Sequence, residues 1–205
     1  MTVMIRQYRE GDQAAVYEVC VRTGAAGQDA RGRYSTDDLV PDLFAGPYLV
    51  LEPEHAYVLD DGGRAVGYII GTADTAGFVA AYRERWLPAL RDKYPGPPAS
   101  PVTQEEQRIH SMYHPEYMLR PELAPHPAHL HINLLPDYQG AGHGRALMTM
   151  FLGSVAAAGA KSCHLAVRNI NTGALGFYDR LGWRPVRVAD AGNTTYLARP
   201  TRGGG

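Results

Sequence analysis

Alternating and helical hydrophobic patterns divide the N-terminal part of the chain into short elements. The run MIRQY at 4–8 alternates as a strand does, and GDQAAVYEVCVRT at 11–23 repeats its apolar residues at helical spacing. The run STDDLVPDLF at 35–44 predicts a second, short helix. Residues 55–74 carry two β-rich runs around Asp61-Gly62-Gly63, which predicts an antiparallel hairpin because these residues tolerate the positive φ of tight turns.

The C-terminal part of the chain alternates strands and helices. Strands are predicted at 128–136, at 162–168 and in two runs within 183–198, and helices at 145–159 and 172–182. Gly182 is placed to end the second of these helices. The order predicts an α+β fold built as α/β/α layers, with residues 1–200 forming a single domain.

Residues 75–127 interrupt this order with a segment rich in proline, aromatic and charged side chains. Its first half has helical spacing, and Pro88 is expected to kink or restart the helix. Thr103 and Glu106 resemble a capping box at the start of another helix. Because connections of this length are uncommon unless they are functional or disordered, we expect residues 75–128 to form an insertion that covers an acceptor site.

Composition excludes several classes of partner. With 20 basic and 21 acidic residues, the net charge of −1 gives no field that would attract nucleic acid or an acidic membrane. Cys20 and Cys163 each lie in an apolar pattern, which favours buried thiols in a reducing compartment. We therefore expect a cytoplasmic monomer or homodimer with no nucleic acid and no membrane partner, and a disordered tail at 201–205.

Three glycines at alternate positions, Gly140, Gly142 and Gly144, separate a predicted strand from a predicted helix. Glycine costs about 1 kcal/mol relative to alanine in a helix, so this run indicates backbone that needs open space. A strand, a glycine loop and a helix N-terminus together form an anion site, since unpaired amides and the positive helix end point to one place. The loop lacks the Gly-Lys-Ser/Thr ending of a nucleoside triphosphate site. Close packing of helix on strand is the alternative explanation.

Two sequence motifs, one at the glycine loop and one about thirty residues later, indicate a particular protein family. Residues 139–144 fit the signature Arg/Gln-x-x-Gly-x-Gly/Ala, and NTGALGFYDRLGW follows at 171–183. At these residues the chain resembles the GNAT superfamily of acyl-CoA-dependent N-acyltransferases. The segments AVYEVC, GYIIGTADTAGF and RERWLPALRDKYP, with the long insertion, look like the acetyltransferase-like domain of protein O-GlcNAcase and its bacterial relatives. The resemblance implies a GNAT fold, with a mixed, mostly antiparallel sheet of about six to seven strands splayed at a bulge and helices on both faces.

The resemblance also implies acetyl-CoA as cofactor and assigns its binding residues. The loop would hold the pyrophosphate and the preceding strand would pair with the pantetheine arm, which Asn171 would bond from the other side. Tyr178 would lie near the sulfur and protonate the departing thiolate as general acid. The remaining cofactor residues assigned in this way are Ile132, Asn133, Leu134, Gln139, Gly140, Ala141, Gly142, His143, Gly144 and Arg145.

The general base is less clearly marked. One GNAT branch uses a strand glutamate five positions before the asparagine, and this chain has Ala166 there. His131 is our candidate base because it alternates with His129 and Asn133 on one strand face, although such residues also bond within a fold. Asp74, at a strand end, is a candidate for amine recognition, although such aspartates commonly cap the next helix. His129 and His131 lack a third ligand, so we expect no metal site.

Two functions remain open at this point. The complete loop with Asn171 and Tyr178 predicts an acetyl-CoA-dependent N-acetyltransferase in which a primary amine attacks the thioester directly. The O-GlcNAcase domain has lost its cofactor loop, and the strand glutamate is missing here. The alternative is therefore a catalytically silent acyl-CoA-binding or protein-interaction module. The acceptor could be a small amine or a protein lysine.

Overall fold

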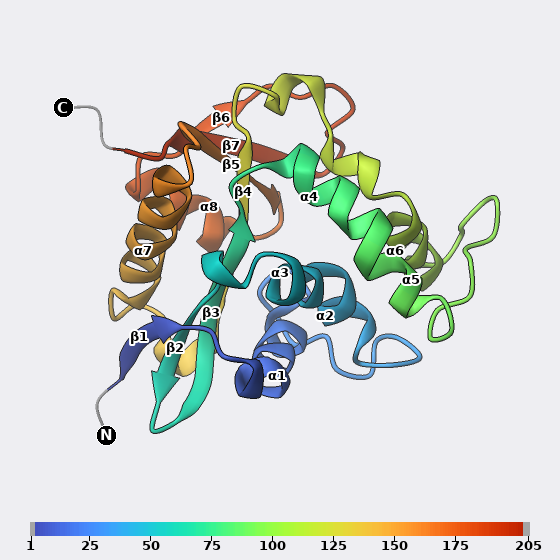
Figure 1. The fold of residues 1–205 in the computed structure, drawn as a ribbon, viewed down its shortest axis with the longest axis horizontal. Coiled ribbons are helices and arrows are strands. Elements are labelled where there is room, and N and C mark those ends of the chain that lie inside the picture. Colours follow the sequence, from blue (N-terminus) through green and yellow to red (C-terminus); the bar gives the residue numbers. More distant parts are fainter. Residues whose placement is uncertain (1–2, 203–205) are drawn as a thin grey trace.

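A seven-stranded sheet forms the centre of the computed structural model, which describes residues 3–202 (Figure 1). The strand order is β1-β2-β3-β4-β5-β7-β6, and only β4 and β5 are parallel. The strands are Met4–Gln7 (β1), Tyr57–Asp61 (β2), Arg64–Thr72 (β3), Ala128–Leu134 (β4), Ser162–Arg168 (β5), Arg184–Val186 (β6) and Thr194–Pro200 (β7). This confirms the predicted α+β class and the mixed, mostly antiparallel sheet.

Helices cover both faces of the sheet (Figure 1). On one side lie α1 (Gln13–Thr23), α2 (Leu39–Phe44) and α3 (Gly46–Leu51), and on the other lie α7 (His143–Ala157) and α8 (Thr172–Arg180). The sequence did not predict α3, which begins where Pro47 can start a new helical turn directly after α2 ends at Ala45. No helix within residues 3–202 has the length and apolar character to cross a bilayer.

Short 3-10 turns occupy Glu10–Asp12 (η1), Pro53–His55 (η2), Pro115–Met118 (η4), Pro121–Leu123 (η5) and Pro136–Tyr138 (η6). A single core of buried apolar side chains extends along the described chain from Val16 to Leu197. Its α7 stripe is the one that the helical spacing predicted: Leu147, Met148, Phe151, Leu152 and Val155 are all buried.

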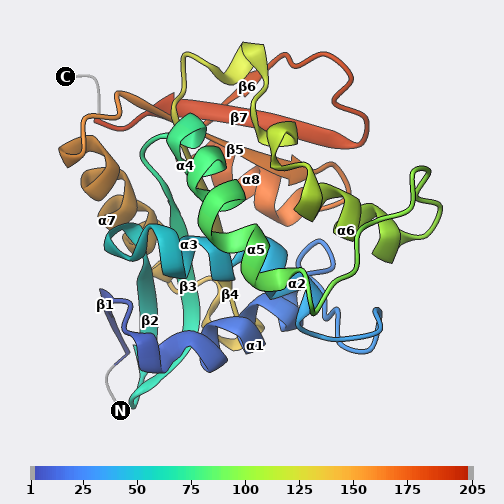
Figure 2. The ribbon, with the colours of Figure 1, turned by 45° about the vertical axis from the view of Figure 1, so that its right-hand side comes forward.

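The insertion is largely helical and stands beside the sheet (Figure 2). Helix α4 (Thr75–Ala81), the π-helical turn η3 (Tyr82–Trp86) and α5 (Leu87–Leu90) follow one another without a break, and α6 (Gln104–Tyr113) comes later. Leu87 N–H donates to Tyr82 O, five residues earlier, and Pro88 has no N–H to donate. The helix therefore passes Pro88 through a wider turn. The predicted capping box at Thr103 and Glu106 is confirmed.

β4 and β5 separate soon after they meet. They pair only at Ala128 with Cys163 and at His129 with His164. The register of β3 with β4 continues unbroken to Leu134, so the bulge that we expected beside the splay is absent from β4. The only register shift found within the described sheet lies between Leu59 and Asp60. The gap therefore comes from divergence of two parallel strands, and it leaves one edge of β4 open beyond His129.

The tail was predicted to be disordered from residue 201, and this is wrong for Thr201. Its side chain is buried, its hydroxyl donates to Ala160 O at 2.6 Å and its amide donates to Lys161 O at 3.1 Å. Both bonds attach the end of β7 to the start of β5. Residues 203–205 lie outside the described part of the chain.

Gly71 in β3 lies where two strands and α7 meet, and an alanine there is expected to destabilise the fold. A Cβ would come within 2.1 Å of His129 O and 2.6 Å of the Phe151 ring. We expect Gly71→Ala to cost about 1–3 kcal/mol, which lowers the melting temperature by roughly 3–10 °C in calorimetry. Gly153→Ala, in open space on α7, is the control and should leave stability unchanged or slightly raised. Equal melting temperatures would contradict the crowding.

Candidate functional site

Two cavities meet at the gap between β4 and β5. The first, the loop cavity, is lined by Gln139, Gly140, Gly142, Gly144 and Arg145 from the glycine loop. The second, the histidine cavity, is lined by His129, His131 and His164 from the two strands. They share lining residues from α1 and the loop after it, from β4 and from α8: Thr23, Ala26, Gly27, Ile132, Asn133, Asn171, Ala174 and Tyr178. A molecule held in one cavity can therefore reach into the other through the gap.

The glycine loop presents a row of amides without protein acceptors. The first bond inside α7 is from Ala146 N–H to Gly142 O. In the described chain, no acceptor is found for the amides of residues 140–145. Six consecutive N–H groups without protein acceptors at a helix N-terminus are an arrangement that suits an anion.

Two glycines give this loop its shape. Gly140 and Gly142 have φ of +79° and +87°, which other residues rarely adopt, and a Cβ on either would meet no protein atom within 4 Å. Close helix–strand packing therefore does not explain these two glycines. Close packing between helices does constrain Gly144, where a Cβ would come within 3.1 Å of the Phe177 ring on α8. Ala141 and His143 belong to the same loop but are not among the residues that line the cavity.

Tyr178 stands at the junction and lines both cavities. Its ring is held edge-on between Phe177 and Trp183, at centroid distances of 5.2 and 5.8 Å. Its hydroxyl makes no hydrogen bond to the described residues. Burial, and less strongly the neighbouring Cys163, raise the pKa of this phenol well above its ordinary value. The hydroxyl therefore stays protonated and is free to donate.

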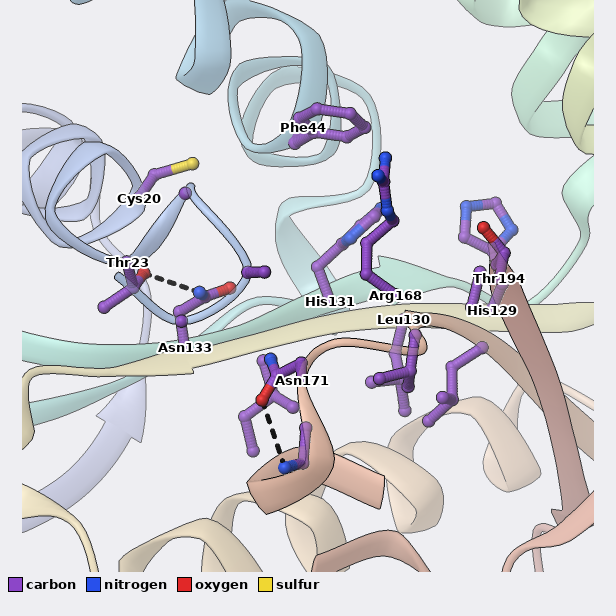
Figure 3. Close-up of a pocket in the computed structure, with 18 of the residues that line it drawn as sticks. Cys20, Thr23, Phe44, His129, Leu130, His131, Asn133, Arg168, Asn171 and Thr194 are labelled. Carbon is purple, nitrogen blue, oxygen red and sulfur yellow. Dashed lines mark hydrogen bonds between the residues drawn. The ribbon is translucent and has the colours of Figure 1, made fainter. Parts of the chain in front are cut away.

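Polar side chains beside the gap are held by the fold. Asn133 donates to the Thr23 hydroxyl and accepts from Tyr68, and Asn171 accepts from Ala174 N as the N-cap of α8 (Figure 3). Gln139 donates to Leu134 O at 2.9 Å, which fixes the loop against the end of β4. Asn171 thus has a structural partner that sequence reasoning did not assign, and its side chain still lines both cavities.

A chain of hydrogen bonds connects the two histidines of β4. The Tyr48 hydroxyl lies 2.7 Å from His129 Nε2 and 3.2 Å from His131 Nε2. His129 Nδ1 lies 2.7 Å from the Thr75 hydroxyl, which donates to Pro127 O at 2.7 Å. Thr75 and Pro127 are also the two ends of the insertion, so the chain of bonds begins where the insertion leaves and rejoins the sheet.

The single proton of each hydroxyl fixes the direction of this chain. Since Thr75 donates to Pro127 O, it accepts from His129 Nδ1–H. A neutral His129 then offers a lone pair at Nε2, to which Tyr48 donates, and the Tyr48 oxygen accepts from His131 Nε2–H. His131 Nδ1 is left as an acceptor, with no hydrogen bond to the described residues. The network thus assigns both tautomers.

Burial keeps these imidazoles neutral. Burial, and less strongly the nearby His164, lower the pKa of His131 from its ordinary 6.5 to about 4. Burial also lowers the pKa of His129 strongly and that of His164. A base this weak does not take a proton from a free ammonium ion of pKa about 10.4. It can accept one from a nitrogen that has become acidic during reaction.

The lowered pKa of His131 predicts a loss of stability in mild acid. Below about pH 6.5 the unfolded chain binds a proton at this residue that the folded chain binds only near pH 4, so stability is complete above 6.5 and falls as pH drops. In urea unfolding at pH 7.5, 6.0 and 5.0, His131→Gln should therefore lose less stability per pH unit than the wild type. The difference should be up to about 1.4 kcal/mol per unit. Parallel pH profiles would contradict the assignment.

Asp74 is not brought to the cavities. Its exposed carboxylate accepts from Ala76 N as the N-cap of α4, and it lines neither cavity. The structure therefore places it in the capping role that the sequence left as the alternative. One group of three residues of the types that can bind metals lies elsewhere in the described chain. The side-chain oxygen or nitrogen atoms of Glu52, Glu54 and His55 lie within 4.8 Å of one another, and none of the three residues lines either cavity.

Sequence reasoning missed several residues of the histidine cavity. Tyr48 is separated from His129 by 81 positions, and no local pattern marked it as a partner. Arg168 is the last residue of the predicted strand β5, and Arg108 lies on the predicted second helix of the insertion. For Arg108 the only signal was the expectation that the insertion covers a site, and for Arg168 there was none.

Comparison with known proteins agrees with this geometry. A crystal structure of SsHAT is 48% identical, covers 99% of this chain and 100% of its own, and superposes with a TM-score of 0.95. A structure of yncA from Salmonella typhimurium with its cofactor acetyl-CoA is 13% identical, with coverage of 100% and 97% and a TM-score of 0.56, which shows the shared fold.

Curated relatives are longer than this chain. Protein O-GlcNAcase from Rattus norvegicus is 28% identical over 180 residues, which are 87% of this chain and 20% of that protein. The same values hold for protein O-GlcNAcase from Mus musculus. The chain thus spans about a fifth of the length of these relatives, and the resemblance expected from the sequence is confirmed. The family model of the Acetyltransferase (GNAT) family matches residues 25–183, well over half of the chain, and the protein therefore belongs to this family.

Proposed function

We propose that the protein is an acetyl-CoA-dependent N-acetyltransferase in which a primary amine attacks the thioester directly. The observation that carries this proposal is the meeting of the two cavities at the gap between β4 and β5, with Tyr178 in the wall of both. The loop cavity is then the cofactor site and the histidine cavity the acceptor site.

The residues of the loop cavity fit acetyl-CoA. The amides of 140–145 have no protein acceptor, and a Cβ on Gly140 or Gly142 would meet open space, which suits a diphosphate. The edge of β4 beyond His129 has no strand partner and suits the amides of a pantetheine arm. When bound, the thioester supplies an activated acetyl group: a nitrogen–carbon bond forms, the carbon–sulfur bond breaks, the nitrogen loses a proton and the sulfur gains one.

Two side chains are placed to handle these protons. Tyr178 keeps its proton at neutral pH and is placed to donate a hydrogen bond to the sulfur as negative charge develops there, while solvent can supply the proton that the sulfur gains. His131 offers Nδ1 as acceptor to the attacking nitrogen, because Tyr48 holds its other ring nitrogen as a donor. Because its pKa is about 4, His131 cannot deprotonate an ammonium ion. It can accept a proton only from an amine that binds in its neutral form and attacks the thioester. Amine deprotonation then depends on solution pH or on desolvation in the cavity.

Direct attack is favoured over an acetylated enzyme. Cys20 is the cysteine among the residues that line the histidine cavity. Burial raises its pKa to about 12, so it remains a thiol, whereas the thiolate is the nucleophile.

Acetyl-CoA binding and thiol release test the proposal in sequence. At a hundredfold excess over Kd, acetyl-CoA should add about 2.7 kcal/mol of stability, visible as a rise in melting temperature. Release of CoA thiol with a panel of primary amines should then exceed the rate without amine. No thermal shift at millimolar acetyl-CoA would overturn the cofactor site. A shift without turnover on any amine would favour the silent acyl-CoA-binding module instead.

A further inference from the structure

The histidine cavity contains positive charge and no carboxylate. Arg108 from α6 and Arg168 from the end of β5 both line it, and none of its lining residues in the described chain is Asp or Glu. Within residues 3–202, neither arginine forms a salt bridge or a side-chain hydrogen bond. Figure 3 shows Arg168 on the same side of β4 as His131 and extending toward Phe44.

Elsewhere the chain neutralises many of its arginines. Arg6 is bonded to Asp12 and Asp60, Arg64 to Glu18, and Arg83 to Glu116. Arg108 and Arg168 have no such carboxylate within residues 3–202, and no carboxylate lines their cavity, so both guanidinium groups are available to a ligand there. Two guanidinium groups without carboxylate partners in one cavity are suited to an anionic guest, because a guanidinium donates charge-assisted hydrogen bonds to an oxyanion.

Phe44 places Arg108 close to the reacting groups. The guanidinium carbon lies 5.0 Å from the centre of the Phe44 ring, and the same ring lies 5.7 Å from the ring of His131. A cation–π contact orients the guanidinium without neutralising it. The anion site is thus one aromatic ring away from the proton acceptor that faces the amine.

The cofactor does not explain these arginines. Its phosphates belong at the glycine loop, and the loop cavity is lined by Arg145 and Arg180, not by Arg108 or Arg168. The two pairs of arginines therefore lie in different cavities, one on each side of the gap.

We propose that the acceptor is a primary amine that also carries an oxyanion, a carboxylate or a phosphonate-like group, which Arg108 and Arg168 bind while the amine meets His131. Guanidinium groups match the geometry of both oxyanions. A lysine-rich peptide would instead bring further positive charge to a cavity with two cations and no carboxylate. This proposal rests on the N-acetyltransferase function above and narrows its substrate class.

Matched acceptors test the charge requirement. Initial rates of CoA release are measured for ω-amino carboxylates, the ω-amino phosphonates of equal chain length and the corresponding alkylamines, with a lysine-rich peptide as a further arm. The best oxyanion-bearing amine should exceed its alkylamine in kcat/KM by roughly ten- to a hundredfold, the range expected of a hydrogen bond to a charged group. The carboxylate and phosphonate arms show which oxyanion is preferred.

Single substitutions test whether Arg108 and Arg168 cause the preference for oxyanion-bearing amines. Arg108→Gln and Arg168→Gln should each bring the ratio of oxyanion-bearing to neutral amine close to one, with unchanged thermal stabilisation by acetyl-CoA. Arg91→Gln, an exposed arginine on neither cavity lining, is the control and should keep the ratio of the wild type. Unchanged ratios in both cavity variants would overturn the proposal.

The outcomes distinguish failure of the proposed oxyanion requirement from failure of the proposed N-acetyltransferase function. If acetyl-CoA does not bind, the proposed function fails. If neutral amines or the lysine-rich peptide react as well as the anionic amines, the function stands and the charge requirement is wrong. If acetyl-CoA binds but nothing turns over, titration of the same amines into the CoA-loaded protein decides: binding of the oxyanion-bearing members alone supports the inference, and equal or absent binding overturns it.

Discussion

Gly142→Ala is expected to remove most of the stabilisation of the protein by acetyl-CoA while the fold remains intact. The residue has φ of +87° at the N-terminus of α7, and its Cβ would project into open space beside the unpaired amides of the loop. An alanine there costs about 1–2 kcal/mol in the left-handed region. If the loop relaxes to avoid this strain, the amides no longer converge; if it does not, the methyl group occupies the place of a phosphate oxygen. Either way we expect at least a thirtyfold rise in Kd, or about 2 kcal/mol.

The other end of the same helix provides a matched control. Gly159 follows α7 with φ of +99°, and a Cβ there also meets no atom within 4 Å. Gly159→Ala should therefore lose a similar amount of stability without ligand and keep the full response to acetyl-CoA in a thermal-shift titration. If both variants respond to acetyl-CoA as the wild type does, the glycine loop is not the diphosphate site.

Local patterns predicted the loop and the strands around it because their causes are local. Glycines at alternate positions before an amphipathic helix require a particular backbone whatever the rest of the chain does. Alternation along β4 also placed His129 and His131 on one face, where the structure finds both bonded to Tyr48. For these parts of the site, residue spacing was sufficient.

Long-range contacts account for what the sequence did not reveal. Tyr48 lies on α3, a helix that two helix-breaking residues, Gly46 and Pro47, concealed. Its position against the strand depends on how α3 packs, which no pattern within either segment encodes. The same limit applies to Arg108, whose place in the cavity depends on the path of the whole insertion. Pairing across a sheet or between helices is set by the global fold, so these residues emerge only from the structure.

Short polar residues illustrate a different limit. Asp74 and Asn171 were both assigned roles toward substrate or cofactor, and both act as N-caps in the structure. A cap and a ligand-binding residue have the same sequence signature, a short acceptor at the start of a helix. Only the surroundings distinguish them: Asn171 lines both cavities, and Asp74 lines neither.

Tyr178→Phe is expected to lower kcat by roughly ten- to a hundredfold while the Kd of acetyl-CoA stays the same, because it removes a hydroxyl that has no hydrogen-bond partner in the described chain from the junction of the cavities. Burial keeps the pKa of this phenol above its ordinary value, so transfer of its proton to a thiolate is uphill and its main effect is to donate a hydrogen bond to the developing charge. Tyr178 should therefore not ionise between pH 8 and about 10. The wild-type rate and the Tyr178→Phe rate should have the same pH dependence over this range.

Tyr138→Phe is the matched control, since it removes a phenol whose hydroxyl bonds to Asp61 and which lines neither cavity. Single-turnover thiol release, measured with saturating acetyl-CoA and the best amine, separates chemistry from product release. A rate for Tyr178→Phe equal to that of the control would remove the phenol from the reaction. A rate reduced only through weaker acetyl-CoA binding would show instead that the ring between Phe177 and Trp183 shapes the junction and does not act on the sulfur.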